Sequence, residues 1–257
     1  MNFPEKGDQV AVITGGASGI GAAIARELGK RRMRVVIADI DSQASAGTVA
    51  DLAAAGIEAR AVSIDVTSAE SIAAAFDEVQ RACGRCDVLV NCAGIAKTYP
   101  FLEFPLDNWQ RTLDVNLTGA LLCSQHAARA MVARGWGRIV NIASVAGMRA
   151  IGVGRTAYGT SKGALIALTR QMAVELAPHG VTANAVCPGP VDTPLTKVLH
   201  SDEFRSEYVR AIPMKRYGTP EEMAAVVGFL ASDGAAYVTG AAIPVDGGFM
   251  AAGVRPD

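Results

Sequence analysis

The stretch QVAVITGGASGIGAAIARELG, residues 9–29, decides the fold that we expect for this chain. Residues 9–14 are largely apolar and β-branched, as in a buried strand, and residues 22–29 repeat apolar side chains at helical spacing. Glycines fill the turn between them, so the backbone there can approach a pyrophosphate, which the free N–H groups of a helix N-terminus attract. The stretch predicts the first half of a βαβ unit, with a phosphate-binding turn that includes Gly15, Ser18, Gly19 and Ile20. No Gly-Lys-Ser or Gly-Lys-Thr follows, which excludes the phosphate loop of nucleoside triphosphatases.

A carboxylate ends the second predicted strand, at residues 34–39. Asp39 stands where an acidic side chain can accept hydrogen bonds from both hydroxyls of an adenosine ribose, and it would repel the extra phosphate of NADP. The basic run at residues 30–34 does not offset this, because Arg34 lies roughly 17 Å away at the other end of the strand. That run fits a helix C-terminus, where cations are favoured. We therefore expect NAD as the cofactor.

Strands and helices alternate along the rest of the chain, with no linker and no repeat. We expect helices at 42–55, 68–82, 106–134, 157–177 and 220–232, and strands at 57–64, 87–94, 137–144, 181–187 and 241–245. Residues 195–218 are more polar and suggest one or two helices of a mobile lid, within a substrate lid at about 189–218. The pattern predicts the α/β class, as one domain over residues 1–257: a single doubly wound Rossmann-type parallel sheet with helices on both faces.

Ligands of such sheets bind beyond the carboxyl ends of the strands. The candidate residues that fall at those ends are Gly15, Asp39, Asp65, Asn91, Ser144 and Pro188. Asp65, followed by Val66, could bind adenine or could serve only as a turn or capping residue. Residues 91–94 read Asn-Cys-Ala-Gly, which makes Asn91 and Gly94 candidates for a place where a cofactor lies flat.

Tyr158 and Lys162 stand at the start of a predicted helix at spacing i, i+4, so they share one face. A free tyrosine has a pKa of about 10, and a neighbouring positive charge lowers it by favouring the phenolate. The pair would suit acid–base chemistry, although the same spacing also occurs by chance on helix surfaces.

Composition excludes several classes of function. A formal net charge of −1 gives no overall attraction to nucleic acid. An odd count of 5 cysteines argues against a disulfide framework, and the Cys83–Cys86 spacing has no second pair for zinc, so we read it as a turn rather than a redox pair and expect no metal site. The polar first residues do not resemble a signal peptide, and no apolar run reaches the ~18 residues of a membrane span. We expect a soluble, cytoplasmic protein.

The chain resembles the short-chain dehydrogenase/reductase family, from the glycine turn at residues 14–21 to Asp-Gly-Gly at 246–248. The Tyr158-x-x-x-Lys162 motif, with Ser144 upstream and Asn116 on the preceding helix, matches the catalytic tetrad of that family. Two features depart from the pattern. Cys92 replaces the usual second asparagine, which affects one structural hydrogen bond, and the Ser144–Tyr158 interval is one residue longer than the commonest version.

The resemblance implies a role for each member of the tetrad. Tyr158 would donate a proton to a carbonyl, or accept one from an alcohol, while Ser144 holds the same oxygen. Lys162 would lower the Tyr158 pKa and bind the nicotinamide ribose, and Asn116 would hold a water in a proton relay. The resemblance also implies that Pro188, Val191 and Thr193 contact the nicotinamide, which exchanges a hydride with the substrate.

The substrate stays open at this level. One alternative is NAD-dependent oxidation of a secondary alcohol such as a polyol, sugar or hydroxy acid. Another is a 3-oxoacyl-(acyl-carrier-protein) reductase, which Arg129 favours, whereas Val174 and the expected NAD preference argue against it. A regulator that binds the dinucleotide without catalysis is a third, opposed by the intact tetrad.

Two further features bear on ligands and partners. Arg149 and Arg155 could hold a carboxylate or phosphate, or could simply be solvated. Apolar helix faces around 106–134 and 157–177, with an edge strand, suggest a homo-oligomer, and the family is commonly tetrameric.

Overall fold

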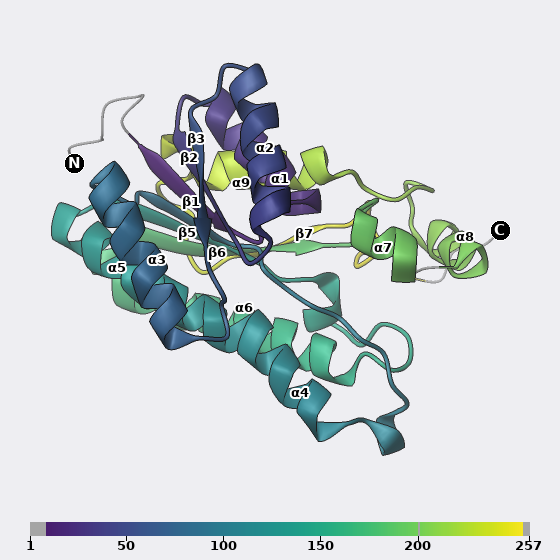
Figure 1. Ribbon diagram of the computed structural model, residues 1–257. Coiled ribbons are helices and arrows are strands. Elements are labelled where there is room, and N and C mark those ends of the chain that lie inside the picture. The colour runs from purple at the N-terminus through teal and green to yellow at the C-terminus, as the bar shows by residue number, and fades with distance from the viewer. Residues whose placement is uncertain (1–8, 200, 254–257) are drawn as a thin grey trace.

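The computed structural model describes residues 9–199 and 201–253. Within them a seven-stranded parallel sheet runs through the middle of the molecule in the order β3-β2-β1-β4-β5-β6-β7 (Figure 1). Its strands are β1 Val10–Thr14, β2 Arg34–Asp39, β3 Ala59–Ser63, β4 Val88–Asn91, β5 Gly137–Ile142, β6 Val181–Pro188 and β7 Ala242–Val245. The chain crosses over between β3 and β4, so the strand order reverses next to β1. The predicted doubly wound α/β fold is confirmed.

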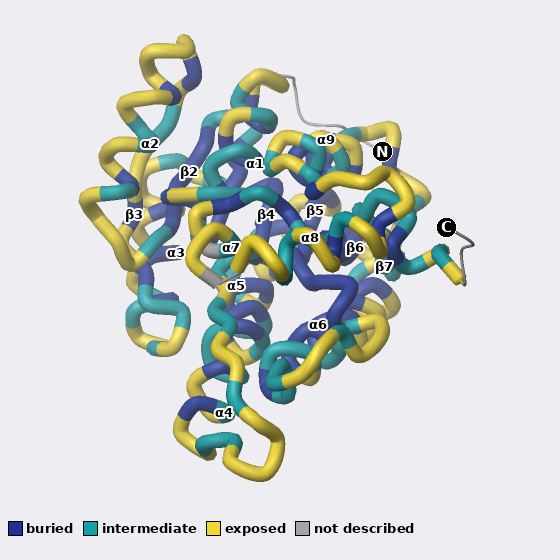
Figure 2. The backbone as a smooth tube through the Cα atoms, turned by 90° about the vertical axis from the view of Figure 1, so that its right-hand side faces the viewer, coloured by how far each residue is buried: buried dark blue, intermediate teal, exposed yellow. Residues whose placement is uncertain are grey.

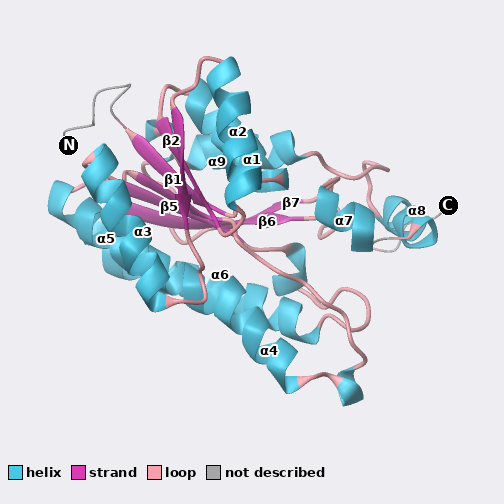
Figure 3. Cartoon of the chain, viewed as in Figure 1, coloured by secondary structure: helices cyan, strands magenta, loops and turns pink. Residues whose placement is uncertain are grey.

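Helices cover both faces of the sheet (Figures 1 and 3). Their bounds are α1 Gly19–Lys30, α2 Ser42–Ala54, α3 Ala69–Cys83, α4 Leu106–Leu113, α5 Gly119–Arg134, α6 Thr156–Leu176, α7 Pro194–Leu199, α8 Asp202–Ala211 and α9 Pro220–Leu230. Helices α1, α2 and α9 lie over one face, and α3, α5 and α6 lie over the other. Across the described ranges, no helix is both long and apolar enough to span a membrane.

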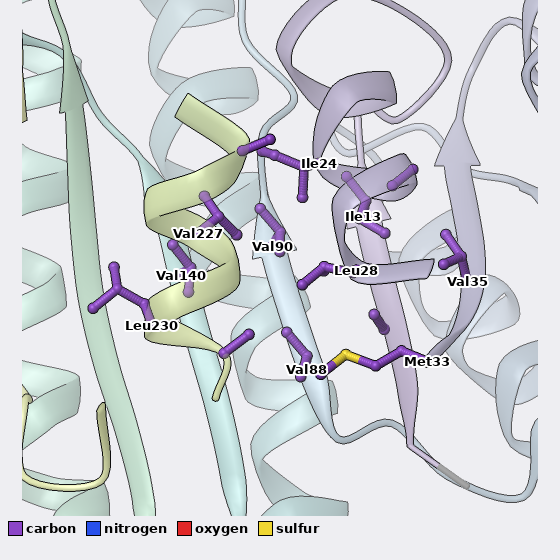
Figure 4. Close-up of a cluster of buried hydrophobic side chains, with 14 of the residues drawn as sticks. Ile13, Ile24, Leu28, Met33, Val35, Val88, Val90, Val140, Val227 and Leu230 are labelled. Atoms are coloured by element: carbon purple, nitrogen blue, oxygen red, sulfur yellow. The ribbon is translucent and has the colours of Figure 1, made fainter. Parts of the chain in front are cut away.

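The two largest apolar cores of the described residues lie on opposite faces of the sheet, because alternate side chains of each strand point to opposite faces. On β1, Ile13 packs with Ile24 and Leu28 of α1 and with α9 (Figure 4), whereas Val12 packs toward α3 and α5. The central strands are buried on both sides, which explains why their sequences are continuously apolar. Figure 2 shows the buried residues concentrated in these strands, with exposed residues on α2 and along the edge strand β3.

The predicted helix at 106–134 is not continuous. A π-helical turn, Asp114–Thr118, separates α4 from α5, and its widened geometry appears in the bond from Gly119 N–H to the carbonyl of Asp114. Gly119 fits this position because an added Cβ would lie 2.6 Å from the Val66 carbonyl oxygen. Asn116 lies inside this turn, and π-helical turns occur frequently at functional sites.

The predicted lid segment contains the two short helices α7 and α8, and its first and last residues are in contact. Val191 forms a parallel bridge with Gly218, and the Asp192 N–H donates to the Gly218 carbonyl at 2.9 Å. Arg205 of α8 pairs with Asp192 and lies over the Tyr217 ring at 4.2 Å. The later part of the segment is thus tied to its first residues, which follow β6.

The segment from Cys83 to Cys86 is a turn between α3 and β4. Gly84 ends α3 in the left-handed conformation (φ 72°), Cys86 is buried, and all five cysteines are free thiols. Burial raises the pKa of the Cys86 thiol far above its usual range, which opposes thiolate chemistry at this position.

Candidate active site

The glycine turn packs against the end of β4 so closely that side chains are excluded. Gly15 has φ 66°, and a Cβ there would lie 2.7 Å from the backbone nitrogen of Ala93. A Cβ on Gly21 would lie 2.1 Å from the Gly15 carbonyl oxygen. Ser18 precedes α1 without a side-chain capping bond, so the N–H groups of the first helical turn stay available to a ligand. This glycine cradle fits a bound pyrophosphate.

A cavity of about 930 Å³ opens at the carboxyl ends of the strands, beside this turn. Fourteen of the sixteen residues predicted from the sequence line it: Gly15, Ser18, Gly19, Ile20, Asp39, Asp65, Val66, Gly94, Ser144, Tyr158, Lys162, Pro188, Val191 and Thr193. The structure therefore brings together residues from most of the length of the chain. Asn91 and Asn116 are not among the residues that line the cavity.

Asp39 lines the cavity from the end of β2 and also holds the glycine turn. Its Oδ2 accepts a hydrogen bond from the Ala17 N–H, and its Oδ1 accepts one from the Asp41 N–H, both at 3.1 Å. Arg34 lies at the opposite end of β2, where it donates to the Cys83 carbonyl at 3.3 Å. The basic residue is therefore far from the carboxylate, as the sequence predicts.

Asp65 serves as a turn residue and also lines the cavity. Its Oδ1 accepts hydrogen bonds from the Thr67 hydroxyl at 2.7 Å and from the Thr67 N–H at 2.9 Å. These bonds hold the pKa of Asp65 below its usual value, and the Arg111 charge adds a smaller effect in the same direction. The turn alternative is thus present in the structure, whereas Ser68 caps α3, and the adenine contact stays a prediction.

The Asn91 side chain points into the protein rather than into the cavity. Its Nδ2 donates to the Asn141 Oδ1 at 2.8 Å and to the Ser124 hydroxyl at 2.9 Å. Asn91 lies on the same side of β4 as Leu89, and that side faces α5. Strand register thus turns this side chain away from the cavity, and the cofactor contact of Asn91 stays a prediction.

Ser144, Tyr158 and Lys162 meet at one end of the cavity. Ser144 lies two residues after the end of β5 and directly before a short helical turn. This turn approaches α6 so closely that a Cβ on Gly147 would lie 2.5 Å from the carbonyl carbon of Lys162. The Lys162 Nζ lies 5.9 Å from the centre of the Tyr158 ring and donates to the Ile142 carbonyl at 2.8 Å. A phenol, a hydroxyl and an ammonium thus lie close together in the cavity wall.

Several groups act on the pKa of Tyr158. Burial raises its pKa above the usual value, while a hydrogen bond with the Ser144 hydroxyl and the positive charge of Arg155 act in the opposite direction. The Lys162 ammonium donates to the Ile142 carbonyl, and its expected effect on the pKa of Tyr158 stays a prediction. Burial lowers the pKa of Lys162 itself to about 8.

Asn116 lies just behind the cavity wall. Its Oδ1 accepts from the Ile95 N–H at 2.8 Å, and its Nδ2 donates to the Ile95 carbonyl and to the Ser161 hydroxyl, both at 3.0 Å. A Cβ on Gly94 would meet the Asn116 Oδ1 and the Lys162 Nζ, each at 3.4 Å. The amide and the ammonium therefore approach the same glycine, and the proposed water relay stays a prediction.

One wall of the cavity, on α4 and the start of the π-helical turn, was not predicted from the sequence. Four polar residues at helical spacing line it: Asp107, Gln110, Arg111 and Asp114. Positions i, i+3, i+4 and i+7 share one helix face, so the pattern was present in the sequence. Ile40 and Thr196 also line the cavity without having been predicted.

Arg149 and Arg155 both lie over aromatic rings. The Arg149 guanidinium is 4.9 Å from the centre of the Phe249 ring, and that of Arg155 is 5.8 Å from the centre of the Phe204 ring. Such distances suit cation–π contacts. Neither arginine is among the residues that line the cavity, so the carboxylate alternative has no direct geometric support.

The buried side chain of Lys162 should lower the free energy of unfolding at neutral pH. The side chain is 4% exposed, and its pKa falls from 10.5 in the unfolded chain to about 8. The unfolded chain therefore binds the proton more tightly, so the penalty is full below pH 8 and disappears as the pH rises toward 10.5. Lys162→Met should raise the free energy of unfolding by about 2 kcal/mol at pH 7, after an offset for the lost bond to Ile142. Urea unfolding at pH 7 and 10 checks this, and a variant less stable than the parent at pH 7 would contradict it.

Comparisons with known proteins agree with this arrangement. A family model described as enoyl-(acyl carrier protein) reductase matches residues 15–250. The chain is 42% identical over 243 residues to the 3-oxoacyl-(acyl-carrier-protein) reductase of Aquifex aeolicus, covering 94% of this chain and 97% of that protein. It is 43% identical over 246 residues to the cis-4-hydroxycyclohexanecarboxylate dehydrogenase of Sinomonas cyclohexanicum, covering 95% and 97%.

A solved structure is also similar over nearly the whole chain. The gluconate 5-dehydrogenase of Burkholderia cenocepacia, in complex with NADP and tartrate, gives a TM-score of 0.91 at 33% identity, covering 95% of this chain and 96% of that one. The fold, the cavity-lining residues and these similarities agree. The chain is an oxidoreductase that belongs to the short-chain dehydrogenase/reductase family.

Proposed function

We propose that this chain interconverts a secondary alcohol and a ketone by NAD-dependent hydride transfer. The observation that carries the proposal is that Ser144, Tyr158 and Lys162 line the same cavity as the glycine turn and Asp39. The α1 N-terminus would hold the pyrophosphate, Asp39 the adenosine ribose, and Lys162 the nicotinamide ribose. When bound, the nicotinamide supplies or accepts the hydride.

The residues of this chain would handle the proton and the substrate oxygen. Tyr158 donates its hydroxyl proton to the carbonyl oxygen in reduction and takes a proton from the alcohol in oxidation. Ser144 donates a hydrogen bond to the same oxygen and fixes its place beside Tyr158. Lys162 keeps positive charge near the phenol when its amine is protonated. Asn116 keeps the wall at Ile95 in place and would hold the relay water.

The preference for NAD rests on Asp39. We expect Asp39→Ala to weaken NADH binding and to improve NADPH binding, so that the NADH/NADPH preference falls by about 10- to 100-fold, which corresponds to 1.4–2.8 kcal/mol. Fluorescence titration of both reduced cofactors measures the ratio. Asp41→Ala is the matched control, since Asp41 caps α2 beside the site but is not among the cavity-lining residues. Tighter binding of NADPH than NADH by the unmutated protein would refute the argument.

For the substrate we propose a polyol, a sugar or a hydroxy acid. Two of the similar proteins named above are dehydrogenases of a hydroxycyclohexanecarboxylate and of gluconate. A 3-oxoacyl-(acyl-carrier-protein) reductase is the second candidate, because a relative of 42% identity carries that name. Val174 is 73% exposed on α6, so that surface lacks the arginine that the second candidate would favour.

A panel of polyols, hydroxy acids and acyl thioesters, followed at the NADH absorbance, tests the proposal. Turnover of hydroxy compounds with NAD supports it. Turnover restricted to 3-oxoacyl thioesters with NADPH would favour the reductase. Cofactor binding without turnover on any compound would identify a dinucleotide-binding regulator instead.

We also propose that residues 189–218 act as the substrate lid and that the protein is a homo-oligomer, a tetramer as in many members of the family. The lid proposal is supported by Pro194 and Thr196, which line the cavity from this segment. The oligomer is supported by exposed apolar side chains such as Val174 and Phe229. Light scattering that gives the mass of one chain, 26.6 kDa, at working concentration would overturn the oligomer.

A further inference from the structure

Ser161 stands between Tyr158 and Lys162 on α6, yet the mechanism above gives it no part. Its side chain is fully buried, at 0% exposure. The hydroxyl accepts a hydrogen bond from the Asn116 Nδ2 at 3.0 Å and donates one to the Tyr158 carbonyl at 2.8 Å. This hydroxyl therefore joins the π-helical turn to the first turn of the helix that carries the acid.

The bonds of Asn116 extend this connection to the cavity wall. The amide pairs in both directions with the Ile95 backbone, and Ile95 lines the cavity. A primary amide has two N–H donors, and here one goes to the Ile95 carbonyl and the other to Ser161. An unbroken run of hydrogen bonds thus leads from the cavity wall through Asn116 and Ser161 to Tyr158, and its central bond, between Asn116 and Ser161, is buried.

The π-helical turn makes this run possible. A residue in a regular helix advances by about 100°, so removing the extra residue of the turn would rotate Asn116 away from the Ile95 backbone. Asn116 is 1% exposed, so solvent water cannot replace a hydrogen-bond partner that the amide loses. Without the Ser161 hydroxyl, one Asn116 N–H would be buried without a partner, and the amide would lose one of the bonds that hold it against Ile95.

We propose that Ser161 is a positioning residue for the reaction: its hydroxyl keeps the Asn116 amide against Ile95 and fixes the backbone of Tyr158 at the start of α6. The inference rests on the proposed function, because it assigns Tyr158 the proton transfer. A serine that only bonds the carbonyl three residues back in its own helix would have no such link. The difference between the two roles can be measured.

Thr169 offers a matched control on the same helix. It is 1% exposed, it accepts from the Asn141 Nδ2 at 2.8 Å, and it donates to the Leu165 carbonyl at 2.7 Å. As at Ser161, a buried hydroxyl accepts from an asparagine amide and donates within α6, here to the carbonyl four residues back rather than three. Thr169 lies farther along α6 and is not among the cavity-lining residues. Thr169→Val removes this hydroxyl, so it measures the effect of losing a buried, doubly hydrogen-bonded hydroxyl away from the active site.

We expect Ser161→Ala to lower kcat by about tenfold with the KM for NADH changed by less than about twofold, because misplaced reacting groups slow chemistry without weakening cofactor binding. Ser161→Thr, which keeps a hydroxyl, should recover most of the rate. Amide exchange at Ile95 should accelerate in Ser161→Ala and not in Thr169→Val. In an Asn116→Ala background, Ser161→Ala should cause no further loss, since coupled residues are not additive.

The results that would overturn the inference are equally defined. Unchanged kcat and unchanged amide exchange at Ile95 in Ser161→Ala would overturn it. So would a double variant, Asn116→Ala with Ser161→Ala, whose loss of kcat equals the product of the two single losses. Persistent turnover by Tyr158→Phe would instead overturn the proposed function. The Ile95 exchange would still report on Ser161 in that case, because this measurement needs no substrate.

Discussion

Replacing Tyr158 with phenylalanine should lower kcat by about 10²- to 10⁴-fold, the usual contribution of a positioned general acid. The change removes one oxygen atom and leaves the ring that packs beside Lys162. NADH binding should change by less than about threefold, because the lost interaction is one made in the transition state. Stopped-flow turnover and fluorescence titration of NADH measure the two quantities on the same protein.

The exposed Tyr237 provides the control for this change. Its side chain is fully exposed, so Tyr237→Phe should leave kcat and NADH binding as they are. In oxidation the rate of the unmutated protein should rise with pH, since the pKa of Tyr158 lies above its usual value and the phenolate is the base. Tyr158→Phe should lose this rise, and a variant that keeps both the rate and its pH dependence would disprove the assigned role.

Gly21→Ala should destabilise the protein by about 3 kcal/mol and abolish saturable NADH binding. The new Cβ would lie 2.1 Å from the Gly15 carbonyl oxygen, a backbone atom that cannot move without opening the turn. Overpacking of this kind typically costs about 1–3 kcal/mol, and here the obstacle is backbone rather than a flexible side chain. Because the turn places the N–H groups of α1, the same shift should remove the pyrophosphate site.

Gly47 provides the opposite case on α2. Nothing lies within 4 Å of a Cβ built at this position, which is exposed and helical. Gly47→Ala should therefore stabilise the protein by about 0.5–1 kcal/mol, the difference in helix propensity, and leave NADH binding unchanged. Urea unfolding and NADH titration of both variants decide the matter. Equal effects of the two substitutions would show that the turn tolerates a side chain.

The order of strands and helices could be predicted because its signals are local. The strand expected at residues 34–39 spans Arg34–Asp39, and the helix expected to stop before Pro178 ends at Leu176. Apolar runs bounded by glycine, proline and acidic residues are enough for such bounds. The convergence of Asp39, Ser144 and Tyr158 then follows from a parallel sheet, whose carboxyl ends share one edge.

Features caused by distant contacts could not be predicted. Asn116 lies in a π-helical turn and its amide pairs with the Ile95 backbone, which is 21 residues away in the chain. The direction of the Asn91 side chain depends on strand register, and one residue of shift reverses it. Arg155 also lowers the pKa of Tyr158, and the familiar Tyr–Lys spacing gives no sign of this contribution.

The strand order has a consequence for biosynthesis. β1 pairs with β2 on one side and with β4 on the other, so Val88–Asn91 must leave the ribosome before the second edge of β1 can close. At about 5–20 residues per second, that edge stays open for roughly 4–15 s after β1 is made. An open apolar strand is a template for pairing with other nascent chains. Slow translation before Val88 would therefore increase aggregation and chaperone dependence, although every residue of the glycine turn has already been made.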